Sequence, residues 1–459
     1  MPKADTFHSN AIVPLTELSI TDAGAAIRDG SLTAKALTRA YLDMIDRRNP
    51  AIRAFVQPDA DRALAAAARA DADFAAGSDR GALQGIPFAV KDLIDVAGAT
   101  VTFGAKDNAG RIAGRTATAV QRMLDAGAVP LGMVATYDLA IVGPSIDGAY
   151  PPARNPWNID HITGGSSSGS AAAVASGMAP VALGTDTGGS VRSPAAYCGI
   201  VGLKPTFDAV PMDGVQPLAP SLDHLGALAR TVQDVAQVFA VLSGTAPRDF
   251  TRGLAGVRIG YARDWNEAEG ASRGVCDLLD DAVATLSLEG AGIALVTLPD
   301  IALMEAAGAV IIHAEMLETY AGNIAGAGGG MGRMAYQSII AGAALTGEDV
   351  ALARSVGARL KGEIDRVFDR CDLIVMATTL TPAPPVSDFA EGRAVWTPMR
   401  TLPFNVTGHP ALSVPMGFVD GLPVGLQIVG RHGAEADILR VGAAFEAATD
   451  HAVQRPPIA

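Results

Sequence analysis

Cysteine is scarce in this chain, and that scarcity narrows the chemistry it can carry. Among 459 residues there are three cysteines, Cys198, Cys276 and Cys371, and none of them forms a CxxC pair. This spacing gives neither a disulfide framework nor a cysteine metal site, and it is typical of a reducing compartment. The seven histidines show no HxxxH or HxH spacing. The sequence therefore predicts no bound metal.

Basic residues and long apolar runs are also few. The formal net charge is −13, so the field of the protein would repel phosphate backbones and anionic lipid surfaces. The longest uncharged stretch, residues 169–184, is interrupted by Gly177 and Pro180 and is too short to span a bilayer. The N-terminus lacks the apolar run of a signal peptide. We therefore expect a cytoplasmic protein with no nucleic-acid or membrane partner.

Helical patterns alternate with short β-rich runs in the first third of the chain. Residues 31–50 carry apolar side chains at helical spacing, and residues 59–76 are rich in alanine. Between and after further helical patterns, residues 85–91 and 128–134 have the apolar composition of buried strands. This alternation predicts an α/β fold with a largely parallel sheet.

The middle of the chain is different in pattern. Residues 206–370 are mostly helical, with strands expected only at 257–261 and 292–297, whereas strands return after residue 370. We expect residues 1–459 to form a single domain in which 206–370 is a mostly helical insertion. The glycine-rich segment 326–332 is either a surface linker or a mobile flap.

Two glycine–serine loops are the first sign of chemistry. Ser166 follows Gly164 and Gly165, and Ser190 follows Gly188 and Gly189. Paired glycines let a chain turn tightly and aim successive N–H groups at one point, which is the geometry that stabilises an oxyanion. The first loop, GGSSSGS, lacks the lysine of a phosphate-binding loop. Taken alone, both loops are also compatible with ordinary turns.

A serine nucleophile needs a partner that accepts its proton, and Lys91 is a candidate. Lys91 lies in the apolar segment FAVKDLID. Its ammonium group could extend to solvent, or it could be held in a dry site where desolvation lowers its pKa and makes it a base. A Ser-His-Asp triad stays open because its members meet only in space. The segment GTDTGGSVR, however, has Arg192 where a GxSxG elbow requires glycine.

Several segments together resemble the amidase signature family. Residues 164–205 resemble its signature segment, with the same gap between the two serines, and residues 85–95 resemble its lysine strand. Residues 408–417 and 421–431 resemble its C-terminal strands, and the resemblance is weakest over about 240–370. It implies an α/β fold with a single large mixed, mostly parallel β-sheet covered by helices on both sides.

The resemblance also implies roles for individual residues. Ser190 is expected to be the nucleophile, Ser166 a bridging serine in a cis peptide, and Lys91 the base. Further expectations are an oxyanion hole made by the backbone N–H groups of Thr187, Gly188, Gly189 and Ser190, and loop support from Ser167, Asp186 and Arg192. The mechanism that the family implies needs no cofactor.

What the resemblance implies about function is a seryl hydrolase that cleaves a non-peptide C–N bond and releases an amine. We expect a neutral small amide or carbamate (urethane) as substrate, with ester hydrolysis as a side activity and a homodimer compatible with the sequence. Apolar residues near the expected strand end, Met133, Tyr137 and Ile141, are candidates for the substrate pocket, although they would equally suit the core.

Other functions stay open at this point. One branch of the family supplies ammonia from glutamine as the A-type component of a multisubunit amidotransferase, and its members usually show a segment like GKTNMDEFA. Here the matching residues 132–140 read GMVATYDLA, so Met133 and Ala135 replace a lysine and an asparagine. A noncatalytic scaffold would not need Lys91, Ser166 and Ser190 together, and an ATP-dependent ligase would need a phosphate loop.

Overall fold

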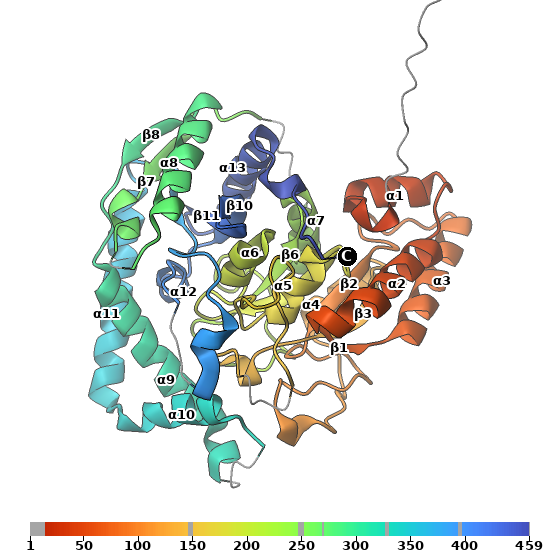
Figure 1. Cartoon of the computed structure of the whole chain (residues 1–459), viewed down its shortest axis with the longest axis horizontal. Helices are drawn as coiled ribbons and strands as arrows, with labels where there is room; N and C mark the ends of the chain where they lie inside the picture. The colour runs from red at the N-terminus through yellow and green to blue at the C-terminus, as the bar shows by residue number, and fades with distance from the viewer. Residues whose placement is uncertain are drawn as a thin grey trace, which may run out of the picture.

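One mixed sheet runs through the molecule. The computed structural model describes residues 14–145, 150–246, 252–268, 270–325, 330–392 and 397–458. In these residues eleven strands pair in the order β1-β3-β2-β4-β6-β5-β10-β11-β9-β7-β8 (Figure 1). The strands are β1 (Phe55–Pro58), β2 (Pro87–Lys91), β3 (Val129–Val134), β4 (Val181–Asp186), β5 (Val201–Lys204), β6 (His224–Ala229), β7 (Arg258–Tyr261), β8 (Gly292–Leu295), β9 (Leu373–Ala377), β10 (Ala411–Val419) and β11 (Leu422–Gly430).

Helices cover both faces of this sheet. The described α-helices are α1 (Ile20–Arg28), α2 (Ala34–Ile52), α3 (Ala60–Ala75), α4 (Thr118–Asp125), α5 (Ser168–Ala175), α6 (Arg192–Cys198), α7 (Val232–Ser243), α8 (Arg273–Leu288), α9 (Ile301–Ala325), α10 (Arg333–Ala341), α11 (Gly347–Val367), α12 (Pro403–Val406) and α13 (Glu435–Ala448). Side chains alternate between the two faces of a strand pair. Ala196 of α6 packs at Gly425, whereas Gly442 of α13 packs at Leu412, which belongs to the opposite face. The predicted single mixed sheet between helical layers is thus confirmed.

The expectation of a mostly parallel sheet is wrong. Parallel pairing occurs between β2 and β3, β2 and β4, β7 and β8, and β7 and β9. The remaining pairs, which make up the centre of the sheet, are antiparallel. The reason is local in one case, because Asp420 and Gly421 form a tight turn at positive φ that joins β10 and β11 as a hairpin.

The middle of the chain contributes more to the sheet than its pattern predicts. Besides the expected β7 and β8, the structure has β6, which lies between β4 and β5 in the sheet. Its sequence, HLGALA, contains glycine and alanine, which are depleted in strands, so its burial rather than its composition explains it. Residues 206–370 as an insertion therefore stay a prediction, and 326–329 of the glycine-rich segment lie outside the described residues.

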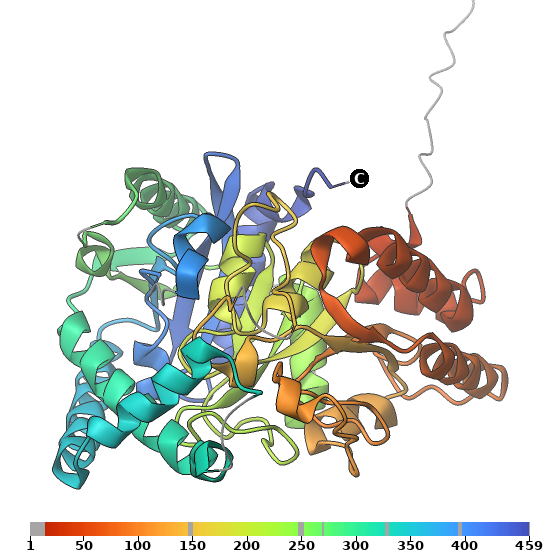
Figure 2. The same ribbon diagram turned by 60° about the horizontal axis from the view of Figure 1, so that its bottom comes forward.

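The two ends of the sheet carry different helices. α1, α2 and α3 lie beside β1 and β3, while α9, α10 and α11 gather at the other side of the molecule, as both views show (Figures 1 and 2). Between them, the short helices α5 and α6 each begin directly at one of the glycine–serine loops. No described helix combines the length and the apolar character needed to cross a membrane.

The close approach of α5 to the sheet generates a stability prediction. A Cβ added to Gly169 would lie 2.2 Å from the backbone nitrogen of Ala135 and 2.5 Å from the carbonyl oxygen of Ala54, whereas a Cβ on Gly362 of α11 meets no atom within 4 Å. Gly169→Ala should lower the free energy of unfolding by at least about 2 kcal/mol, since backbone must move. Gly362→Ala should raise it by about 1 kcal/mol. Urea denaturation measures both, and equal effects in the two variants would contradict this packing.

Candidate active site

Lys91 is buried at the end of β2. Its side chain is 0% exposed, so it does not extend to solvent. The Nζ atom lies 2.8 Å from Ser166 Oγ and 2.8 Å from Thr185 Oγ1. Burial lowers the pKa of Lys91 to about 7, although the carboxylates of Asp186 and Asp223 act in the opposite direction. A large fraction of this amine is therefore uncharged near neutral pH.

Ser166 lies in the loop that leads into α5. The Gly165–Ser166 peptide bond is cis. The loop is held from one side by Tyr137, whose N–H donates to the Ser166 carbonyl at 3.2 Å. The ring of Tyr137 packs so closely on Gly165 that a Cβ there would lie 2.3 Å from the ring. Glycine is therefore required at residue 165, and the serine that follows is placed against Lys91.

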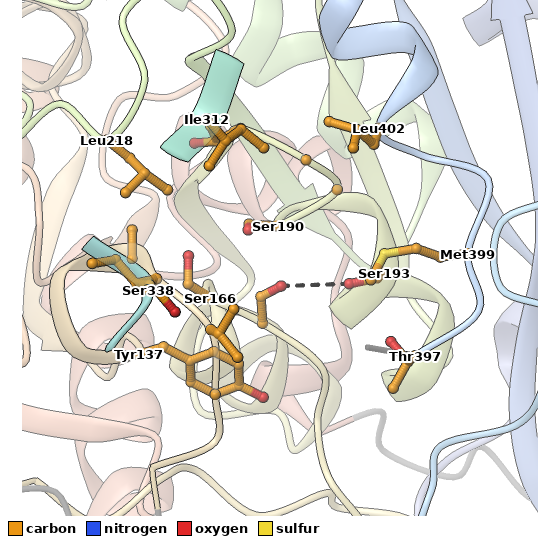
Figure 3. Close-up of a pocket in the computed structure, with 18 of the residues that line it drawn as sticks. Tyr137, Ser166, Ser190, Ser193, Leu218, Ile312, Ser338, Thr397, Met399 and Leu402 are labelled. Carbon is orange, nitrogen blue, oxygen red and sulfur yellow. Dashed lines mark hydrogen bonds between the residues drawn. The ribbon is translucent and has the colours of Figure 1, made fainter. Parts of the chain in front are cut away.

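Ser190 lies in the turn between β4 and α6, and its hydroxyl faces the same cavity as that of Ser166 (Figure 3). Gly189 in this turn has φ of 130°, and a Cβ there would lie 2.1 Å from Thr401 Oγ1. The same Thr401 hydroxyl donates to the Gly188 carbonyl at 2.7 Å. The two serine loops are joined by a bond from the Ser167 N–H to the Ser190 carbonyl, at 3.2 Å.

The four predicted oxyanion donors are not equivalent. The Gly189 N–H donates to Asp186 Oδ1 at 2.9 Å, so this donor is already occupied within the protein. The N–H groups of Thr187, Gly188 and Ser190 have no acceptor among the described residues. Thr187 is held by its hydroxyl, which donates to Asp223 at 2.5 Å. The structure therefore differs from the expectation at Gly189, which shapes the turn instead of facing the cavity as a free donor.

A buried ion pair supports the Ser190 turn from below. Arg192 and Asp186 are both 0% exposed, and Arg192 Nη2 lies 2.8 Å from Asp186 Oδ1. Burial alone would raise the pKa of Asp186, but the Arg192 guanidinium holds that pKa below its ordinary value. Arg192 also donates to Gln427 of β11 and to Asn405 of α12. The turn is thereby fixed to two distant parts of the chain.

Ser167 supports the other side of the site. Its hydroxyl donates to the Thr185 carbonyl at 3.1 Å and accepts from the Thr185 N–H at 3.2 Å. Thr185 is in turn one of the two hydroxyl partners of Lys91. The three supporting residues predicted from sequence, Ser167, Asp186 and Arg192, are thus placed under the two loops, and none of them lines the cavity.

A cavity of about 440 Å³ opens above both serines. Figure 3 shows Tyr137, Leu218, Ile312, Met399 and Leu402 around it. One wall is a face of α9, which the sequence did not indicate, and its lining residues are Glu305, Ala306, Ala309, Ile312, His313 and Met316. Tyr137 and Ile141 line the cavity, whereas Met133 does not: it lies in β3, is 2% exposed and packs in the core.

Few charged groups face this cavity. Its described lining contains no lysine, arginine or aspartate, and Glu305 is the one carboxylate. Arg400 lies 3.6 Å from Glu305 and compensates its charge. His313 is engaged by the Ser338 carbonyl, 2.8 Å from its Nδ1. The arrangement suits a neutral, largely apolar group held next to two hydroxyls and a set of backbone N–H donors.

Comparisons with known proteins agree with this geometry. A family model described as Amidase matches residues 36–439. The A-type component of the glutamyl-tRNA(Gln) amidotransferase of Chloroflexus aggregans is 36% identical, over 96% of this chain and 98% of its own. The peptide amidase of Stenotrophomonas maltophilia has a TM-score of 0.84 and 32% identity, over 97% of this chain and 99% of its own. A further crystal structure of an amidase has a TM-score of 0.86 and 29% identity, over 94% and 99%.

The buried ion pair generates a prediction. Arg192→Met should lower the free energy of unfolding by about 3–5 kcal/mol, because it leaves the Asp186 carboxylate buried without its cation. The matched control is Arg258→Met, since Arg258 pairs with Asp372 at the surface, where both side chains are well exposed; it should change stability little. Denaturant titrations of both variants provide the measurement. Similar small losses in the two variants would show that the Asp186–Arg192 pair does not hold the turn.

Proposed function

The chain belongs to the amidase family, and on this premise we propose that it hydrolyses the C–N bond of a small neutral amide or carbamate through an acyl-enzyme on Ser190. The observation that carries the proposal is the contact between a fully buried Lys91 and the Ser166 hydroxyl, at 2.8 Å. An amine with a pKa near 7 in that position is able to accept a proton at neutral pH.

The proton relay starts at Lys91. The uncharged amine takes the Ser166 proton while Ser166 takes the Ser190 proton, and the Ser190 oxygen forms a bond to the substrate carbonyl carbon. When the tetrahedral intermediate collapses, the C–N bond breaks and the relay runs in reverse, so the departing amine receives the proton. A water molecule then attacks the acyl-enzyme by the same route and releases the acid, or carbamic acid in the case of a urethane.

Backbone N–H groups stabilise the charge that develops on the carbonyl oxygen. Thr187, Gly188 and Ser190 offer donors with no competing acceptor among the described residues. In related chemistry the loss of one such donor costs about 2.7–4 kcal/mol of activation free energy. The bonds from Gly189 to Asp186 and from Thr401 to Gly188 keep these donors in place before substrate arrives, so little reorganisation is needed during the reaction.

The lining of the cavity supports a neutral substrate. A free amino acid amide such as glutamine carries a carboxylate, and burying it requires a cation. The described lining has no lysine or arginine, and the nearby Arg400 already faces Glu305. Tyr137, Ile141, Ile312 and Met399 instead offer apolar contact of the kind that an aryl or alkyl group would use.

A second function has an observation in its favour. Curated relatives that are 35–37% identical are named as the A-type component of glutamyl-tRNA(Gln) amidotransferase, which is one part of a larger assembly. In that function the chain would release ammonia from glutamine for a partner protein. Met133 and Ala135, which replace the lysine and asparagine usual in that branch, and the lack of a cation on the described cavity wall favour the hydrolase.

The experiment is an amidase assay without nucleotide, metal or partner. We expect the parent protein to release p-nitroaniline from a neutral acyl p-nitroanilide and to do so faster than it releases ammonia from glutamine. Ser190→Ala and Ser166→Ala should each lower kcat by at least about 10⁴-fold. Ser176→Ala, in the same serine-rich region but outside the cavity, is the matched control and should leave kcat unchanged.

Two outcomes would contradict the proposal separately. If glutamine were the better substrate, or if hydrolysis appeared only with a partner protein, the substrate part would fail and the amidotransferase would be favoured. If Ser190→Ala kept parental activity, the acyl-enzyme part would fail. A panel containing an anilide, an alkyl amide, an ester and a phenyl carbamate then ranks the substrate classes at one enzyme concentration.

A further inference from the structure

Three residues that can bind a metal ion meet away from the catalytic cavity. Asp365 lies near the end of α11, His409 lies just before β10, and His432 follows β11. One ligand atom from each of them lies within 4.8 Å of the other two. No pattern in the sequence indicates this cluster, because the three residues come from three separate segments and none of them is close to another in the chain.

Thr407 orients both imidazoles of this cluster. His409 Nδ1 lies 2.9 Å from the Thr407 hydroxyl, and His409 Nε2 lies 3.0 Å from Asp365 Oδ1. His432 Nε2 donates to the Thr407 carbonyl at 3.0 Å, so its Nδ1 carries the lone pair. A bond from the non-ligating ring nitrogen to a nearby oxygen is the usual arrangement around histidine ligands, because it fixes the tautomer and the ring.

We propose that Asp365, His409 and His432 form a binding site for a divalent transition-metal ion of the zinc type, with water as the remaining ligand. Two imidazoles and one carboxylate suit zinc, cobalt or nickel, whereas calcium and magnesium require sites made of oxygen. His409 is fully buried and forms the floor of the site, while Asp365 and His432 are exposed and leave a path for the ion. The site is independent of the proposed catalytic function.

Lys361 makes the proposal more specific. Its Nζ donates to Asp365 Oδ2 at 2.7 Å, on the same helix, and leaves Oδ1 to face His409. The ammonium group orients the carboxylate but also repels a cation at this short range. Lys361→Met should therefore bind the metal more tightly than the parent protein does. An adventitious surface site would give no such gain.

The site is connected to the rest of the fold through α12. Thr407 directly follows α12, and Asn405 of the same helix donates to Asp186 at 2.8 Å. An ion that ties α11 to the segments on either side of β10 and β11 should stabilise the folded state by mass action. We expect saturating zinc to raise the Tm of the parent protein, with no requirement that hydrolysis depend on it.

The test uses the full chain after treatment with a chelator that is then removed. Isothermal titration with ZnCl₂ should show one ion per chain, and Co²⁺ should give the visible absorption band of a low-coordinate site. His432→Ala and Asp365→Asn, both at exposed positions, should each weaken the affinity by more than about 100-fold. His451→Ala removes the histidine of a different His–Asp pair, with Asp450 at 3.7 Å, and should not change the affinity.

The results that would overturn the proposal are equally definite. Absence of zinc binding at millimolar metal would do so, as would an affinity that His432→Ala and Asp365→Asn leave intact. Weakening by His451→Ala to the same degree would reveal an adventitious ion only. An unchanged or weaker affinity in Lys361→Met would exclude Asp365 as a ligand. Circular dichroism of each variant verifies that it is folded before the titrations are compared.

Discussion

The active site depends on a lysine amine that is kept out of water and within reach of a hydroxyl. Lys91 ends a strand in the middle of the sheet, where neighbouring strands cover it on both sides. The two hydroxyls beside it, from Ser166 and Thr185, come from different segments and are fixed by backbone bonds. If this lysine were exposed it would stay charged at neutral pH, and the serine relay would have no base.

A second constraint acts on the Ser190 turn. Arg192 and Asp186 bury a charged pair beneath it, which is costly unless every hydrogen-bonding group is used. The pair meets this condition by reaching Asn405 and Gln427, so the turn, α12 and β11 form one polar network. The same network explains why Gly189 gives its N–H to Asp186 and why residue 189 must be glycine.

The sequence was informative where function is carried by a local motif. The glycine–serine loops and the Lys91 strand indicated the family, the α/β class and a single mixed sheet, all of which are confirmed. Strand direction was not predictable, because it depends on how distant segments return to the sheet. β6 was missed since its composition is poor in β-forming residues, and its place between β4 and β5 is set by burial.

Residues that act through long-range proximity were also out of reach. The α9 wall of the cavity lies in a helix that is apolar along most of its length, so periodicity did not single out Glu305 or Ile312. Met133 was expected in the pocket from its position near Tyr137, but alternation along β3 turns it into the core. The Asp365–His409–His432 cluster comes from three segments that only the folded chain brings together.

The most direct test of the central claim is the pH dependence with which a fluorophosphonate labels Ser190. If Lys91 is the base, the labelling rate should rise as pH increases, with a midpoint near 7, because the neutral amine dominates above that pH. Lys91→Met should label far more slowly and without that midpoint. A parent rate that still rises beyond about pH 9, or a profile that Lys91→Met leaves unchanged, would show that a buried uncharged lysine does not activate this serine.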